Sequence, residues 1–158
     1  MRRFLVFIVI AVVLSTQSVS ASDYCFEEAG REYNISPVLL YAIASVESGF
    51  NPKAINKNGN GTYDYGIMQI NSSWYKKLGH ETWMSLGDPC TNIKTGAMIL
   101  KDCIDRKGHT WEAVGCYNAA SKSKRSTYAN KIYREIRKME GQTASLQSEK
   151  NKRGVNTR

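Results

Sequence analysis

The chain has 158 residues, which is enough for one domain with a buried core, and its 42% hydrophobic residues are typical of a globular protein. Its formal net charge of +8 favours a polyanionic partner. Nucleic acid is such a partner, but the sequence contains no nucleic-acid-binding motif, so we expect none.

The first 21 residues have the pattern of an export signal. Arg2 and Arg3 precede eleven unbroken apolar residues from Phe4 to Leu14, and the small residues at 19–21 end with a cleavage site after Ala21. A membrane anchor is the alternative, but eleven helical residues reach only about 17 Å of a hydrocarbon core about 30 Å thick. We therefore expect cleavage, which would lower the formal net charge from +8 to +6. No later apolar run is long enough to span a membrane.

Two helices are predicted next. Asp23 is a candidate cap for a helix that ends near Tyr33, and Ser36-Pro37 offers an N-cap with proline at the first helical position of a second helix. Glu47 is near the end of this second helix.

Glu47 lies four residues after Ile43 and seven after Leu40, so the helical spacing puts it on the apolar face. Partial desolvation there favours the neutral acid, and we expect a pKa raised by about one or two units. Such a group suits general acid catalysis near neutral pH. Gly49 and Pro52 end the helix, which predicts that the carboxyl emerges at the rim of a cleft.

A turn-rich segment follows. The dipeptides at 58–59 and 60–61 are both Asn-Gly, the strongest short hairpin signal, and residues 62–65 and 67–70 are predicted to form short strands. Asp64 lies on this predicted hairpin.

The rest of the chain is predicted to be helical up to about residue 140. Ser72 or Ser73 caps a short helix that ends at Gly79, and another short helix precedes Gly87. Further helices are expected to begin at Asp88-Pro89, Thr110 and Ser126, with inward-facing stripes that include Ile93, Ala97, Leu100 and Ile104 in the first and Tyr128, Ile132, Ile136 and Met139 in the last. From residue 142 the apolar periodicity stops and basic residues dominate, so residues 142–158 are expected to be a disordered basic tail.

Four cysteines, at positions 25, 90, 103 and 116, indicate two disulfides in an oxidising compartment, and three pairings are possible. No Cys-x-x-Cys occurs, so we predict no metal site.

Three short sequence blocks resemble those of a known enzyme family. The run ESGFNP at 47–52, the run GIMQIN at 66–71 and the run AVGCYNAA at 113–120 resemble, in order and spacing, the signature blocks of soluble lytic transglycosylases. The likeness is strongest to small enzymes of this family that accompany type III and type IV secretion machines. This resemblance implies a mainly α (α+β), lysozyme-like fold with a small β-hairpin over residues 22–141.

In that family the glutamate that ends the helix is the catalytic acid and base, here Glu47. The run from Asp64 to Asn71 also resembles animal c-type lysozymes, in which an aspartate at this place is the second catalytic carboxylate. The resemblance further implies saccharide contacts from a set of motif residues, namely Ser48, Gly66, Met68, Gln69, Tyr117 and Asn118, with core packing as the alternative for Met68. The family has glycine where this chain has Ala120.

A cysteine pair equivalent to Cys25–Cys90 recurs in the resembled family, which leaves Cys103 with Cys116 on consecutive helices. Tyr63, Tyr65 and Trp74 are further candidates for stacking on sugar rings, although a single aromatic is more often in the core.

The resemblance implies cleavage of the β-1,4 bond between N-acetylmuramic acid and N-acetylglucosamine of peptidoglycan by a periplasmic monomer, without a metal or organic cofactor. The expected product is a 1,6-anhydro sugar, and a secretion-system component is a possible partner. Two alternatives remain: hydrolysis, as in lysozyme, with Asp64 as the second carboxylate, and a non-catalytic wall-binding or assembly protein on the same scaffold.

Overall fold

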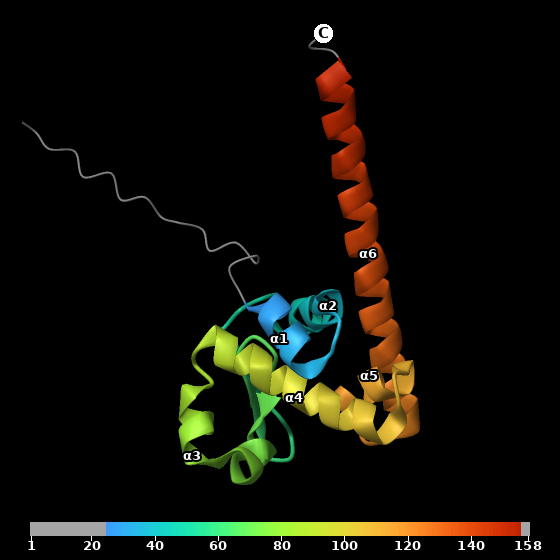
Figure 1. Ribbon diagram of the computed structural model, residues 1–158. Coiled ribbons are helices and arrows are strands. Elements are labelled where there is room, and N and C mark those ends of the chain that lie inside the picture. The colour runs from blue at the N-terminus through green and yellow to red at the C-terminus, as the bar shows by residue number, and fades with distance from the viewer. Residues whose placement is uncertain (1–24, 156–158) are drawn as a thin grey trace, which may run out of the picture.

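The computed structural model describes the chain from residue 25 to residue 155, so the predicted export signal lies outside the described residues (Figure 1). The fold is mainly helical, with one small sheet. The helices are α1 (Phe26–Tyr33), α2 (Pro37–Ser48), η2 (Ser72–Trp74), α3 (Tyr75–Ser85), α4 (Pro89–Lys107), α5 (Trp111–Asn118) and α6 (Lys122–Val155).

The sheet has three antiparallel strands in the order β1-β2-β3, which are β1 (Ile55–Lys57), β2 (Tyr63–Tyr65) and β3 (Ile70–Asn71). The turn predicted at the Asn-Gly dipeptides is confirmed, because it joins β1 to β2, in which Asn56 is paired with Asp64. The strand β2 lies in the predicted 62–65 segment, whereas β1 was not predicted. The strand predicted at 67–70 is wrong for its first three residues. Gly66 and Gln69 have positive φ angles of 81° and 51°, so residues 66–69 form a turn.

Helix α4 runs through the middle of the molecule, with α1 and α2 on one side of it and the sheet and α3 on the other (Figure 1). Its predicted start is confirmed, because the Asp88 side chain accepts from Thr91 N at 2.7 Å. The predicted stripe is also confirmed: Ile93, Ala97 and Leu100 are fully buried, and Ile104 is nearly so.

Some of the predicted helix starts are confirmed, and others differ in the structure. Thr110 caps α5 as expected, whereas the side chain that caps η2 is Asn71 and not Ser72 or Ser73. Gly79 kinks α3 where the sequence predicts a break between two short helices. Helix α6 starts at Lys122 and not after Ser126, and its first turn packs closely on α5, where Gly115 meets the backbone of Arg125.

Residues 142–155 continue α6, so the disordered tail expected there is wrong for this segment. An existing helix is extended without a new nucleation step, and this segment contains good helix formers and no proline. The side chains of residues 142–151 are all exposed, and in Figure 1 this half of α6 stands clear of the body. Among the described residues, no helix combines the length and the apolar character that crossing a bilayer requires.

Two disulfides join the helices, and the pairing expected from the resemblance is confirmed. Cys25 before α1 is bonded to Cys90 of α4, and Cys103 of α4 is bonded to Cys116 of α5. The first bridge closes a loop with a sequence separation of 65 residues, and the second closes one of 13. Both bridges end on α4, which therefore anchors α1 and α5 to the same central helix.

Candidate active site

A cleft of about 1020 Å³ opens between the helices and the sheet and contains both predicted catalytic carboxylates. Glu47 enters it from the end of α2, and Asp64 from β2. Of the other predicted site residues, Gln69, Tyr117 and Asn118 line the cleft, together with Trp74. The sequence blocks that carried the resemblance therefore meet at one place.

Glu47 is largely removed from water, and this burial raises its pKa to about 7. A hydrogen bond from the Tyr128 hydroxyl and the positive charge of Lys131 oppose the increase, whereas the negative charge of Asp64 adds to it. The upward shift predicted from the helix spacing is thus confirmed in direction. A carboxyl with this pKa holds and releases a proton near neutral pH, as general acid and base catalysis requires.

Tyr128 fixes the orientation of this carboxyl. Its hydroxyl donates to Glu47 Oε1 from α6, and burial raises the pKa of Tyr128 far above its usual range, so it stays a donor. Tyr117 stacks beside it, with ring centroids 6.4 Å apart, and donates to the carbonyl of Met68 at 2.8 Å. The two tyrosines link α5 and α6 to the acid and to the 66–69 turn. The sequence placed Tyr128 on an inward face but gave no sign of this bond.

Asp64 is held by two asparagine side chains. Asn71 donates to Oδ1 at 2.6 Å and Asn58 donates to Oδ2 at 2.9 Å, so both oxygens have a donor from the sheet region. Asn58, Asp64 and Asn71 all line the cleft. This carboxylate is therefore oriented by hydrogen bonds, whereas Glu47 is controlled mainly by burial.

The 66–69 turn forms the part of the cleft next to Asp64, and Asn92 of α4 holds it from behind. Asn92 is buried; its Oδ1 accepts from Met68 N at 2.9 Å, and its amide donates to the carbonyls of Tyr65 and Leu86. Gln69 donates to Gly66 O at 2.7 Å and accepts from the Asn56 amide. Asn92 was not predictable from the sequence, because a lone asparagine inside a predicted helix has no distinctive pattern.

Three of the residues predicted to contact the saccharide do not line the cleft, and their contact with a saccharide stays a prediction. Met68 is fully buried and packs against Gly96, so the core alternative holds for this side chain. Gly66 is buried against Asn92, and Ser48 Oγ donates to Ile67 O at 2.8 Å. The Ser48 hydroxyl and the close packing of Gly66 on Asn92 support the turn from behind, and the turn points the Met68 side chain into the core.

Two of the aromatic candidates lie outside the cleft. Tyr65 packs against the core, and Tyr63 is 39% exposed and packs edge-on against Trp83 of α3. Trp74 is the aromatic from this group that lines the cleft, and Lys77 lies 4.6 Å from the centre of its ring.

Comparison with known proteins agrees with this geometry. The family described as Transglycosylase SLT domain matches residues 24–139. Invasion protein IagB of Salmonella typhimurium is 43% identical over 93% of this chain and 93% of its own length. Protein IpgF of Shigella flexneri is 45% identical over 70% of this chain and 77% of its own. A peptidoglycan-binding-like protein of Escherichia coli O157:H7 is 39% identical over 83% and 86%. The chain therefore belongs to the transglycosylase SLT domain family and is a lytic transglycosylase.

Proposed function

We propose that Glu47 is the catalytic acid and base that cleaves the β-1,4 bond between N-acetylmuramic acid and N-acetylglucosamine in peptidoglycan. The observation that carries this proposal is the pKa of about 7 of a partly buried carboxyl that lines the cleft and accepts a hydrogen bond from Tyr128. At neutral pH a large fraction of this carboxyl keeps its proton.

The reaction needs one proton donor and then one proton acceptor. Protonated Glu47 gives its proton to the glycosidic oxygen as the bond to C1 breaks, and an oxocarbenium-like centre develops at C1. The resulting Glu47 carboxylate then accepts the proton of the muramic acid 6-hydroxyl while that oxygen bonds to C1. Atoms and charge balance without an added water, and the product is a 1,6-anhydro sugar.

Ring closure competes with attack by water because the 6-hydroxyl belongs to the same sugar. A well-placed intramolecular group can have an effective molarity of about 10⁵ M or more, far above the concentration of water. The cleft therefore has to orient the sugar, and Gln69, Tyr117 and Asn118 are the lining residues that we assign to this task.

A second outcome, hydrolysis with Asp64 as the second carboxylate, has one observation in its favour. Asp64 lines the same cleft, and its charge acts on Glu47. An aspartate held by Asn58 and Asn71 can stabilise positive charge at C1 whether water or the 6-hydroxyl attacks. We therefore assign Asp64 to stabilisation of the oxocarbenium-like centre.

Product masses separate the two outcomes. Purified peptidoglycan is digested with the enzyme, and the muropeptides are weighed by mass spectrometry. Anhydro products are expected; products heavier by one water would identify a hydrolase.

Glu47→Gln is expected to bind peptidoglycan and to lose lytic activity, and full activity in this variant would remove Glu47 from the mechanism. A parent protein that binds without cleaving would instead support a wall-binding role.

We also propose that the chain is exported and opens the wall locally for a secretion apparatus. Two disulfides and the predicted signal at 1–21 favour an oxidising compartment outside the cytoplasm. The resemblance to secretion-associated transglycosylases, and a relative named as an invasion protein, support the second part. Tagged protein found in the periplasmic fraction, lacking residues 1–21 by mass, is the expected result.

A further inference from the structure

The end of the cleft formed by the last turn of α4 and the first turn of α6 is basic. Arg106 and Lys107 come from α4, and Lys124 and Arg125 come from α6, and all four line the cleft. We call these four residues the basic end. A positive residue at a helix C-terminus is common, because it compensates the helix dipole. That explanation applies to Arg106 and Lys107, but not to two cations at the start of α6.

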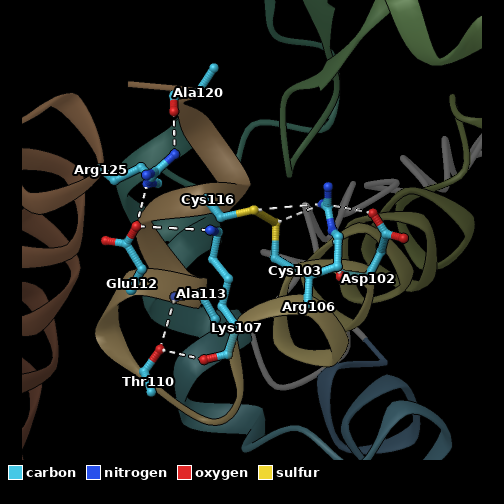
Figure 2. Close-up of polar contacts among 10 residues, drawn as sticks. All are labelled: Asp102, Cys103, Arg106, Lys107, Thr110, Glu112, Ala113, Cys116, Ala120 and Arg125. Carbon is cyan, nitrogen blue, oxygen red and sulfur yellow. Dashed lines mark hydrogen bonds and ion pairs between the residues drawn. A yellow bond between two sulfur atoms is a disulfide. The ribbon is translucent and has the colours of Figure 1, made fainter. Parts of the chain in front are cut away.

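Carboxylates nearby neutralise only part of this charge. Glu112 is shared by Arg125, at 2.6 Å, and Lys107, at 3.9 Å, and Figure 2 shows both side chains converging on it. Asp102 pairs with Arg106 at 2.8 Å and is also 3.7 Å from Lys77. Among the described residues Lys124 has no ion-pair partner within 4.0 Å. Two carboxylates thus face four lining cations, so the net charge of this group of side chains is positive.

The side chain of Arg106 is oriented by contacts with its neighbours. Its Nε donates to the Asp102 carbonyl at 3.0 Å, and its guanidinium lies 3.6 and 3.7 Å from the two sulfurs of the Cys103–Cys116 bridge (Figure 2). It remains 59% exposed. A guanidinium that is oriented before binding loses less entropy when it pairs with a planar carboxylate.

We infer that the basic end binds a carboxylate of the peptide attached to the glycan, so that the enzyme selects peptide-bearing sugars. This inference rests on the proposed function. In intact peptidoglycan the lactyl carboxyl of each muramic acid is bound in the amide bond to its peptide, so the glycan itself offers these cations only uncharged hydroxyls and amides. The peptide stem, by contrast, brings free carboxylates. Glu47 and Lys124 line the same cleft, so one ligand can contact both residues.

The test compares two substrates that share one glycan. Purified peptidoglycan is used intact, or after an amidase has removed the stem peptides and the lactyl carboxylates that this frees have been converted to amides. We then measure kcat/KM for anhydro product on each substrate. The parent is expected to prefer the intact form by about tenfold. Lys124→Gln should reduce this preference about threefold, and Lys124→Gln with Arg106→Gln should bring the ratio close to one. Lys124→Arg should restore it.

Lys122→Gln is the matched control, because it removes the same charge from the same turn of α6 at a position that does not line the cleft. Its substrate ratio should equal that of the parent. If the parent cleaves both substrates and the Lys124 and Arg106 variants keep its ratio, the inference is overturned and the proposed function stands. If the parent forms no cleavage product from either substrate, the proposed function fails.

Discussion

Glu47 is kept protonated near neutral pH by the removal of water, and this arrangement has a cost in stability. In the unfolded chain a glutamate ionises near its ordinary pKa of about 4.5, whereas in the fold it does so near 7. The folded state therefore loses stability as the pH rises from about 4.5 to about 7, by roughly 3 kcal/mol in total, and the loss is complete above pH 7.

Glu47→Gln cannot ionise, so its free energy of unfolding should exceed that of the parent at pH 8 but not at pH 4.5. Urea unfolding at the two pH values measures the difference, which should grow by about 3 kcal/mol between them. Glu27→Gln removes an exposed carboxyl from α1 and is the control. A constant difference between parent and Glu47→Gln across this range would contradict the burial argument.

Tyr128 lowers the pKa of Glu47 through its hydroxyl, against the larger effect of burial. In Tyr128→Phe the anionic form loses a donor, and the alkaline limb of the rate against pH should move upward by about 0.5 to 1 unit. The maximal kcat should fall about tenfold, because the carboxyl is no longer oriented. Tyr133→Phe changes an exposed tyrosine of the same helix, packed on Trp111, and should match the parent in both readouts. An unmoved limb would remove Tyr128 from this role.

At the scale of elements, α4 is the support on which the site is built, and the Cys103–Cys116 bridge ties α5 to it. On the chain-entropy argument, closing a loop of this length contributes about 3 kcal/mol. Cys103→Ala with Cys116→Ala should therefore lower Tm by about 6 to 12 °C in calorimetry. The pair is close to Tyr117, so local loosening of α5 should also raise amide exchange there. An unchanged Tm would show that packing alone holds α5 to α4.

Elements with strong local signals could be predicted from the sequence. The starts of α4 and α5 depend on Asp88-Pro89 and Thr110, whose capping bonds involve residues only three positions away. The strand β1 was missed, because its three exposed residues have no alternation, and the start of α6 was misplaced. The first turn of α6 contacts a different helix, with Gly115 against the Arg125 backbone, and such a contact leaves no local pattern in the sequence.

In the active site, too, features with a local sequence signal were predictable, whereas features set by distant contacts were not. Glu47 was predictable because its burial follows from the apolar spacing of its own helix. The bonds from Tyr128 and Asn92 were not, since their partners lie 81 and 24 residues away in the chain. Met68 illustrates the limit: an apolar run of two residues fits both a strand and a turn, and only the positive φ angles of Gly66 and Gln69 decide between them.

At the scale of the whole molecule, the second half of α6 buries no side chain against the catalytic body over residues 142–151. The inward stripe of α6 ends at Met139, which packs on the core, and the side chains of residues 142–151 are exposed. A helix segment that buries nothing adds little to global stability, because helices in proteins depend mainly on packing of an apolar face.

Truncation after Gly141 should therefore leave Tm within about 2 °C of the parent and keep the rate of anhydro product formation on purified peptidoglycan within about twofold. Truncation after Ile132 is the contrasting variant, since it removes Ile136 and Met139 from the core and the Ser45–Glu135 hydrogen bond of 2.9 Å between α2 and α6. That variant should unfold at a clearly lower temperature, and because α2 carries Glu47 it should also lose activity. A large loss of Tm after removal of residues 142–158 would mean that the exposed half of α6 packs on the body in solution.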